Sequence, residues 1–319
     1  MSNWPLNAEV LQGIAHTGFY GALASEESMR IYPRICQIID QSDLSTTYTS
    51  FGNTPEPRQL SGSVASTGER QAYGMKDYKI TGTVVEWEQT VEVPRSVIET
   101  NPGEIGRITS QMAQKASLFM DRRLVGTVLP AATAGYDGSA LYSDSGHTET
   151  GTAQDNNLAG TSATGTKPTA AEIESDMDTV LGTLKGFTDD RLTPVNEGVS
   201  RFIVLVPLSF EFLFKNTLEK PPVGSVPSVD ASGATGRFRG MFDVIASAFV
   251  ATADRHYIFT DRQDTKAVAL LKNKPFEFVT NIGTDSDAWR HKQTAIFSSY
   301  ARFEFIPWDW KTTCRVIYT

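Results

Sequence analysis

A long helix predicted over residues 101–129 constrains the fold of this chain more than any other stretch of the sequence. Asn101 is placed to cap the first turn, Pro102 suits the first helical position, and Glu104 completes the spacing of a capping box. Apolar side chains then recur at helical spacing until Pro130: Ile105, Ile108, Met112, Ala116, Phe119, Met120 and Leu124. Such a helix is roughly 40 Å long. It suits either a core helix of an α+β protein or a strut that carries flatter sheets.

The N-terminal residues 1–44 hold short apolar clusters separated by glycine and proline, and no single periodic element is predicted to cover them. Two interpretations stay open for this segment. It is either an arm that packs against another copy of the chain or a terminal strap on its own domain.

Residues 45–93 run from a segment rich in Ser, Thr, Gly and Pro into the alternating stretch YKITGTVVEWEQTVEV. This pattern predicts a two-stranded ribbon with little apolar surface. Because an isolated ribbon is marginally stable in water, we expect it to lie on a neighbouring molecule. The expected contact residues in it are Tyr73, Tyr78 and Trp87. Lys76 and Lys79 lie in the same arm, but the sequence offers no acceptor for a cross-link.

The stretch after Pro130 is hydrophilic and rich in turn residues, so we predict an exposed hairpin or flexible loop. His147 lies in it, with Asp144 and Glu149 nearby. No second His or Cys stands at ligand spacing, so neither a metal site nor a catalytic role is predicted.

An α/β lobe is predicted to follow. It consists of a helix over 170–186, a buried strand over 201–207, a helix beginning at Ser209 and successive strands within 241–272. The last segment, 288–319, contains two long strands that we expect to return to the long helix. The domain of that helix is then discontinuous in sequence.

Composition limits the partners of the chain. With 319 residues it can bury one large core or two smaller ones, and its formal net charge is -8. A protein that grips nucleic acid over a wide face usually carries the opposite sign. If this protein lies near DNA, we therefore expect it to enclose the DNA rather than to bind it tightly.

The termini and cysteines indicate an intracellular, soluble chain. No basic region followed by an apolar run opens the sequence, and no segment approaches the length of a membrane span. Cys36 and Cys314 lie far apart in apolar contexts. Two buried, reduced thiols are expected there, and a disulfide between them is left open.

Catalytic patterns are missing: the sequence holds no GxSxG, HExxH, phosphate-binding loop or CxxC pair. None of the 4 histidines belongs to a cluster with cysteines or carboxylates at metal-ligand spacing. The acidic pairs Asp189–Asp190 and Asp261/Asp264 suit solvated turns. We predict a protein that is not an enzyme and has no catalytic residue, cofactor or metal.

The order of these parts resembles the major capsid protein fold of tailed bacteriophages, the Hong Kong phage capsid fold, and most closely the Mu-like major head subunit family. The likeness lies in an ordered series over residues 30–319 rather than in one motif. Its main stretches are TYTSFGNTPEPRQLSG (47–62), KDYKITGTVVEWEQTVEVPRSVIETNPG (76–103), YDGSALYSDSGHT (136–148), RFIVLVPLSFEFLF (201–214), GMFDVIASAFVATADRHYIFTD (240–261), PFEFV (275–279) and AWRHKQTAIFSSYARFEFIPWDW (288–310). A longer Thr/Gly/Ala stretch at 150–168 departs from the family.

The resemblance implies an α+β fold with a set division of the chain. The expected parts are an N-terminal arm (1–44), an extended loop or β-ribbon (45–93), a peripheral domain (94–169 and 286–319) with the spine helix 101–129, and an α/β axial domain (170–285). The stripe through Ile108, Met112 and Phe119 is then expected to face the returning strands. The exposed or subunit-facing side is expected to carry Arg107, Lys115, Arg122 and Arg123.

The implied function is that of a major capsid protein that assembles into the icosahedral shell around a packaged phage genome. The implied partners are other copies, as hexamers and pentamers, a separate scaffolding protein, a portal and a decoration protein, with loose proximity to double-stranded DNA and no membrane. The implied location is the virion capsid, after assembly in the host cytoplasm. The candidate inter-subunit contacts are Tyr73, Lys76, Tyr78, Trp87, Arg122 and Arg123.

Three alternatives belong to other classes. An encapsulin-like compartment shares the fold and encloses cargo enzymes. A phage tail or baseplate protein has similar ribbons, but does not normally carry this long helix beside an α/β lobe. A soluble enzyme is disfavoured by the missing acid–base cluster.

Overall fold

A computed structural model describes residues 8–51, 77–149, 151–162, 167–219, 237–252, 254–282 and 288–318. The chain divides into two compact units, which are treated separately below. Unit 1 comprises Met1–Thr46, Gly82–Pro130 and Val268–Ile306, and unit 2 comprises Thr47–Thr81, Ala131–Ala267 and Pro307–Thr319.

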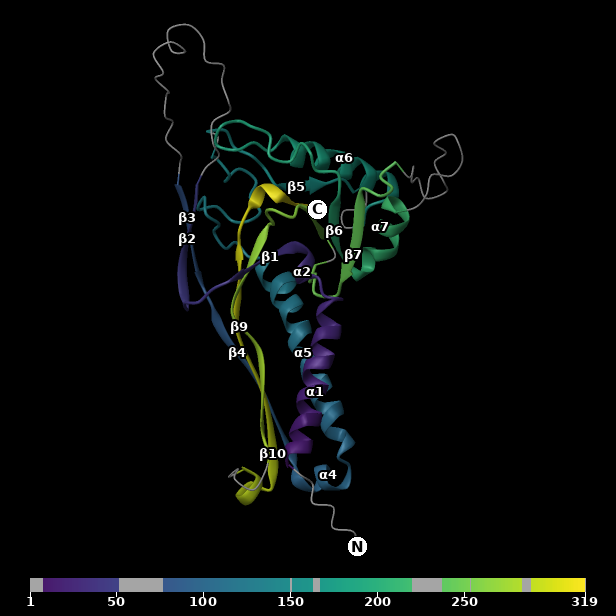
Figure 1. Cartoon of the computed structure of the whole chain (residues 1–319). Helices are drawn as coiled ribbons and strands as arrows, with labels where there is room; N and C mark the ends of the chain where they lie inside the picture. Colours follow the sequence, from purple (N-terminus) through teal and green to yellow (C-terminus); the bar gives the residue numbers. More distant parts are fainter. Residues whose placement is uncertain are drawn as a thin grey trace. The chain divides into compact units, whose positions relative to one another are not determined.

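Unit 1 packs helices on one sheet (Figure 1). Its helices are α1 (Ala8–Glu27), α2 (Tyr32–Ile35), α4 (Arg95–Thr100) and α5 (Gly103–Arg123), with π-helical turns at Leu124–Val128 and Ala288–Lys292. The sheet order is β1 (Cys36–Asp40), β9 (Val268–Asn281), β10 (Thr294–Pro307) and β4 (Val85–Pro94). β1 runs parallel to β9, and β4 runs antiparallel to β10.

The core of unit 1 lies where α5 meets α1 and the strands. The predicted stripe of α5 is largely buried, with Ile108 and Phe119 half-buried. Met112 belongs to the same core cluster as Phe297 of β10. Phe119 packs 6.3 Å from Phe303 of β10, measured between ring centroids. The prediction that this stripe faces the late strands is therefore confirmed at Met112 and Phe119.

The predicted start of the long helix is wrong. Asn101 ends α4, because its N–H donates to the carbonyl of Val97 at 2.9 Å, and α5 begins at Gly103 without a side-chain cap. Glu104 does not close a capping box, because its carboxylate accepts from Arg107 Nε at 2.6 Å. The short helix α4 ends at the position where the cap of α5 was predicted. The residue pattern around Asn101 does not indicate this preceding helix.

The N-terminal segment also differs from its prediction, because one helix, α1, covers residues 8–27. Its buried residues Leu11, Ala15, Phe19 and Leu23 recur every four positions, and they join the core of unit 1. Phe19 stacks on Phe278 of β9 with 4.6 Å between ring centroids. Tertiary packing thus outweighs the low helix propensity of the glycines within this helix.

Gly18 is the point of closest approach between α1 and α5. A Cβ atom at this position would meet Thr109 Oγ1 at 2.7 Å and the Gly106 carbonyl oxygen at 3.4 Å. Thr109 is fully buried and its hydroxyl donates to the Ile105 carbonyl at 2.9 Å, so it has no room to move aside. Gly13 and Gly21, on the same helix, have nothing within 4 Å of such a Cβ.

Unit 2 is built on a five-stranded sheet. Its order is β5 (Asn157–Gly160), β11 (Thr313–Tyr318), β8 (Arg255–Thr260), β6 (Phe202–Pro207) and β7 (Phe242–Ser247). β11 runs parallel to β5 and antiparallel to β8, while β6 runs antiparallel to β8 and parallel to β7. All residues of β6 are buried, as predicted for a strand covered on both faces.

Two helices accompany this sheet: α6 (Ala170–Gly186) and α7 (Glu211–Leu218), the latter preceded by a 3-10 turn at Leu208–Phe210. The predicted bounds of α6 are confirmed, and a capping box of Thr169 and Glu172 starts it. α6 contacts β11 and α7, and α7 contacts β6 and β7. A separate two-stranded sheet pairs β2 (Ser45–Phe51) with β3 (Asp77–Thr83).

The two units divide the chain differently from the predicted domain boundaries. Residues 131–169 and 307–319 belong to unit 2, because β5 and β11 pair with each other and β11 pairs with β8. Residues 268–282 belong to unit 1, because β9 pairs with β1 and lies beside β10. The cause is long-range strand pairing, which the local alternation of each strand does not specify.

The loop after Pro130 is not the exposed hairpin that its composition predicted. Leu141, Tyr142, His147 and Asn156 are all buried, although the backbone around them is irregular. Cys36 in unit 1 and Cys314 in unit 2 are both buried thiols, as expected from their apolar contexts.

Substituting Gly18→Ala should destabilise unit 1 by about 1–3 kcal/mol, because the added methyl group overpacks the α1–α5 crossing. Gly13→Ala and Gly21→Ala are the matched controls, and each should gain roughly 0.5–1 kcal/mol from helix propensity. Denaturant unfolding with hydrogen exchange on α1 measures the difference. Equal behaviour of Gly18→Ala and Gly13→Ala would contradict the proposed close approach.

Acid should weaken unit 2 through His256, which is fully buried between Phe214 and Tyr318. Burial lowers the pKa of His256 from 6.5 to about 3. The unfolded chain therefore binds this proton at a higher pH than the folded chain. Stability falls as the pH drops from 6.5 towards 3, by at most about 1.4 kcal/mol per pH unit.

The variant His256→Leu should flatten this part of the stability curve, since leucine takes up no proton. Calorimetric melting temperatures of the two proteins across that pH window provide the measurement. Curves that stay parallel would refute the assignment to His256.

Candidate functional site

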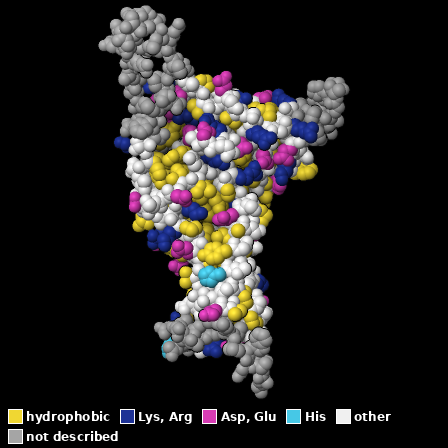
Figure 2. Space-filling model, in the orientation of Figure 1, with side chains coloured by type: hydrophobic (Ala, Val, Ile, Leu, Met, Phe, Trp, Pro, Cys, Tyr) yellow, Lys and Arg dark blue, Asp and Glu magenta, His cyan; other side chains and the backbone are white. Residues whose placement is uncertain are grey.

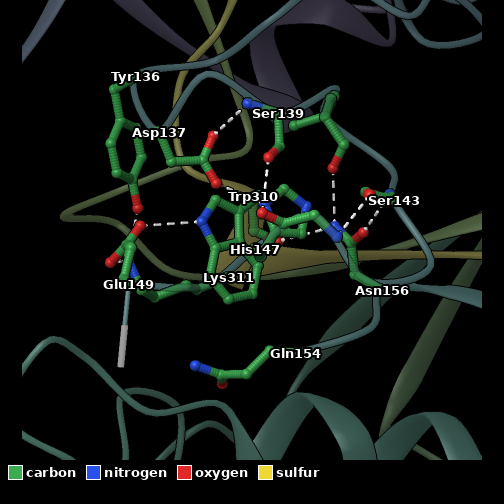
Figure 3. Close-up of polar contacts among 12 residues, drawn as sticks. Tyr136, Asp137, Ser139, Ser143, His147, Glu149, Gln154, Asn156, Trp310 and Lys311 are labelled. Atoms are coloured by element: carbon green, nitrogen blue, oxygen red, sulfur yellow. Dashed lines mark hydrogen bonds and ion pairs between the residues drawn. The ribbon is translucent and has the colours of Figure 1, made fainter. Parts of the chain in front are cut away.

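A polar cluster surrounds Trp310 inside unit 2 (Figure 3). Trp310 lies in a 3-10 turn, Trp310–Thr312, that Asp309 caps by accepting from the Lys311 N–H. Its ring stacks on His147 with 4.1 Å between centroids and 7° between planes. Its indole N–H donates to Glu149 Oε1 at 3.0 Å. One tryptophan thereby holds two residues of the irregular loop.

His147 and Asp137 form an imidazole–carboxylate pair, with 2.6 Å between Nδ1 and Oδ2. Asp137 also accepts from the Ser139 N–H at 3.1 Å. His147 is fully buried, and its Nε2 has no hydrogen-bond partner in the described part of the chain. The adjoining cavity measures about 10 Å³, which is room for one water molecule at most. A substrate cannot reach this pair, so its role is structural.

Lys311 and Glu149 form a buried ion pair, with 2.7 Å between Nζ and Oε2. Their side chains are 10% and 3% exposed. Lys311 also donates to the Tyr136 hydroxyl and lies over the Tyr136 ring. Burial raises the pKa of the Tyr136 phenol, and Asp309 adds to the rise. Tyr136 is therefore a neutral hydrogen-bond acceptor for the lysine.

Asn156 ties the loop to the last strand. Its side-chain carbonyl accepts from the Ser143 N–H at 2.9 Å. Its amide lies within hydrogen-bond distance of three backbone carbonyls, those of Leu141 at 2.7 Å and of Trp310 and Thr313 at 3.3 Å. The loop folds on these bonds instead of on an apolar face of its own, which explains why hydropathy predicted it to be exposed.

A cleft of about 390 Å³ opens beside this cluster. Aromatic residues line much of it, namely Tyr48, Tyr78, Tyr136 and Trp308, together with Arg262 and the acids Glu149, Asp189, Asp190, Asp264 and Asp309. Arg262 Nε donates to Asp264 at 2.9 Å. Burial, with help from Glu149, raises the pKa of Tyr78 to about 12, so this phenol is neutral and cannot serve as a base at neutral pH. Burial likewise raises the pKa of the Asp309 carboxyl.

Metal and membrane sites find no support in the described residues. They contain no group of three His, Cys, Asp or Glu side chains that could hold a metal ion. No helix among them is long and apolar enough to cross a membrane.

The predicted inter-subunit residues fall into different settings. Tyr73 and Lys76 lie outside the described residues. Tyr78 lines the cleft, 5.2 Å from the ring of Tyr136, and Arg122 is exposed on α5. None of these placements tests a contact with another copy, which stays a prediction.

Trp87 and Arg123 point into unit 1. The Trp87 ring packs 4.8 Å from Phe119, and its indole N–H donates to the Phe303 carbonyl at 3.0 Å. Arg123 forms two hydrogen bonds with Glu304, at 3.1 and 2.9 Å, and its guanidinium lies 5.5 Å over the Trp87 ring. The inward direction of Trp87 could have been predicted from the alternation of β4, because Trp87 shares a strand face with the buried Val93.

Four residues of the cluster were not predicted from the sequence: Asp137, Asn156, Trp310 and Lys311. None of them belongs to a recognisable motif, and they meet only when the loop closes on β11. Their neighbours in space lie up to 175 residues apart in the chain.

Comparison with known families now bears on these observations. The family model described as phage capsid protein matches residues 77–316. The chain belongs to the phage capsid protein family. A search of curated protein sequences finds no match.

Solved structures share the fold of this capsid protein at low sequence identity. The capsid protein of the cyanophage P-SCSP1u has 10% identity and a TM-score of 0.60, over 91% of this chain and 88% of its own. The procapsid protein of bacteriophage JBD30 has 16% identity and a TM-score of 0.54, over 99% and 76%. A virus-like particle protein from Pyrococcus furiosus has 6% identity and a TM-score of 0.52, over 94% and 98%.

The predicted α+β capsid fold is therefore confirmed, and so is the function of a major capsid protein that builds the shell of the virion. The narrower likeness to the Mu-like head subunits stays a prediction. The cluster around Trp310 ties the irregular loop to the turn before β11.

Removing one partner of the buried ion pair tests this structural role. Lys311→Met should destabilise unit 2 by about 3–5 kcal/mol, because it leaves the Glu149 carboxylate buried without a cation. Adding Glu149→Gln should recover much of the loss, since the amide oxygen still accepts from Trp310. Denaturant unfolding of the three proteins measures both steps.

Lys215→Met is the matched control, because Lys215 lies 2.7 Å from Glu211 but both side chains are more than 40% exposed. That change should cost less than about 0.5 kcal/mol. Similar losses for Lys311→Met and Lys215→Met would rule out a structural role for the buried pair.

Proposed function

We propose that copies of this capsid protein form the hexamers and pentamers of an icosahedral phage head, and that the β2–β3 ribbon belongs to an extended loop lying on a neighbouring copy. The family match over residues 77–316 carries the proposal, since it covers both units. In this proposal α5 is the spine helix of the peripheral domain, and the five-stranded sheet of unit 2 forms the axial domain.

The ribbon supports the extended-loop role by its chemistry. β2 and β3 pair with each other, and within the described residues neither joins a larger sheet. Their facing side chains are partly hydroxyls, as in the contact of Thr47 and Thr81 at 2.9 Å. Within unit 2 the ribbon also packs through Tyr48 on Trp308 and Tyr78 on Tyr136. A two-stranded sheet by itself is marginally stable, and in this proposal a second copy supplies further contacts.

The proposed relation to DNA is enclosure without tight binding. The chain carries a net charge of -8, and the face in Figure 2 shows acidic and basic side chains interspersed rather than a continuous basic area. Weak contact with the inner surface lets packaged DNA leave readily, because affinity for DNA depends on the number of phosphates neutralised.

The remaining partners belong to this proposal too. A separate scaffolding protein and a portal take part in assembly, which occurs in the host cytoplasm, and a decoration protein binds the finished shell. The proposed role as a shell protein calls for no cofactor, metal or enzymatic activity.

A compartment shell of the encapsulin type is the second candidate, and the likeness to the Pyrococcus furiosus particle protein favours it. The contents of assembled particles separate the two. Packaged double-stranded DNA supports the phage head, whereas particles filled with cargo protein support the compartment.

Replacing residues 52–76 by a short Gly-Ser linker should abolish shell formation and leave both units folded, because the change removes contacts between copies rather than the described cores. Electron microscopy scores closed shells, and circular dichroism with hydrogen exchange on β6 scores folding. The full-length chain, expressed alone and with its phage's scaffolding protein, is the control. Normal shells from the shortened chain would exclude the extended-loop role.

A further inference from the structure

The solvent-facing side of α5 is basic. Arg107, Lys115 and Arg122 are all exposed there, at intervals of eight and seven residues, which correspond to about 12 and 10.5 Å along a helix. Arg107 pairs with Glu104 at 2.6 Å. Among the described residues, no carboxylate forms an ion pair with Lys115 or Arg122.

The outward side of β4 is acidic. Glu86, Glu88 and Glu92 are exposed and share one face of the strand, because alternate residues of a strand point the same way. Glu86 pairs with Arg302 of β10 at 2.7 Å. Glu88 and Glu92 have no basic partner within the described residues, and they lie about 13 Å apart along the strand.

These two charged rows lie on different elements of unit 1. The opposite face of β4 carries Trp87 and Val93, which pack towards the helix layer, as the 4.8 Å contact of Trp87 with Phe119 shows. The glutamates therefore point away from α5. Lys115 and Arg122 lie on an exposed flank of α5, next to Phe119 on the helix surface, four residues before it and three after it. Among the described residues no ion pair joins the two rows within one copy.

We propose that the basic row of α5 in one subunit docks on the acidic row of β4 in the next copy of this chain. The two cations Lys115 and Arg122 then face the two carboxylates Glu88 and Glu92, at spacings of about 10.5 and 13 Å that long side chains bridge. A contact between two different surfaces of opposite charge is head-to-tail, and it closes into a ring when the rotation permits. The inference rests on the proposed assembly into capsomers and names its contact.

A second copy fits both rows, whereas DNA fits only one. A phosphate backbone is attracted to Lys115 and Arg122 but leaves Glu88 and Glu92 without cations. The contribution of such exposed pairs is mainly to register and to the choice of partner. That role suits a shell in which one surface must recognise another many times over.

Charge reversal tests the contact in the full-length chain. The pair Lys115→Glu and Arg122→Glu should lower the yield of closed shells at least about tenfold, because like charges then oppose each other across the contact. The pair Glu88→Lys and Glu92→Lys should do the same. Combining all four substitutions restores opposite charges, so the yield should return to within about twofold of the unaltered protein.

Lys185→Glu with Glu197→Lys is the matched control, because both residues are exposed in unit 2, and this pair should assemble normally. Hydrogen exchange on α5 and β4 confirms that unit 1 stays folded in each variant. Normal shells from either reversed pair would overturn the inference, as would failure of the fourfold variant to recover. Shells of normal yield that package less DNA would assign the α5 row to DNA instead. Absence of shells from the unaltered chain, with its scaffolding protein present, would overturn the proposed function as well.

Discussion

The apolar stripe of α5 must be buried from two directions at once, and much of unit 1 depends on this constraint. The strands β9 and β10 cover the side that carries Met112, while α1 covers the side that carries Thr109. Neither cover is formed by residues next to the helix in sequence. The close crossing at Gly18 brings α1 near enough for Phe19 to reach Phe278 of β9. Helix and sheet therefore share one core, and a methyl group at that crossing disturbs both.

With the apolar residues of α5 turned inwards, its cations are left on the outside. The same logic applies to β4, whose apolar face packs on α5 while its glutamates point outwards. Burial thus leaves cations on the exposed surface of α5 and carboxylates on the outward face of β4. For a member of a capsid family these are two surfaces of opposite charge, which suit the head-to-tail contact proposed between copies.

Unit 2 is stabilised differently from unit 1, because its long loop has few apolar residues to bury. Its order comes from polar groups that are almost completely paired, with Trp310 holding His147 and Glu149, and Asn156 holding the backbone. Such networks are costly when incomplete and specific when complete. The ion pair of Lys311 and Glu149 fixes the position of the loop because the loop cannot shift without burying an unpaired charge.

The sequence by itself determined the elements whose local pattern agrees with their final setting. α6 has the bounds that the sequence predicts, and β6 is buried as its unbroken apolar run predicts. The charged side of α5 follows from its helical periodicity. The capsid fold was predicted from a resemblance in the order of the elements. None of these features depends on a particular distant neighbour.

Only the tertiary structure decided the features that depend on residues far away in the chain. The helical state of the N-terminal segment depends on such a neighbour, α5, and the inward turn of Trp87 and Arg123 depends on β10. The Trp310 cluster is the clearest case, since no motif links Asp137 or Asn156 to a tryptophan more than 150 residues later. Hydropathy and periodicity report the average surroundings of a residue. They do not report which partner forms a hydrogen bond with a buried polar group, and those partners determine where the residues of the Trp310 cluster lie.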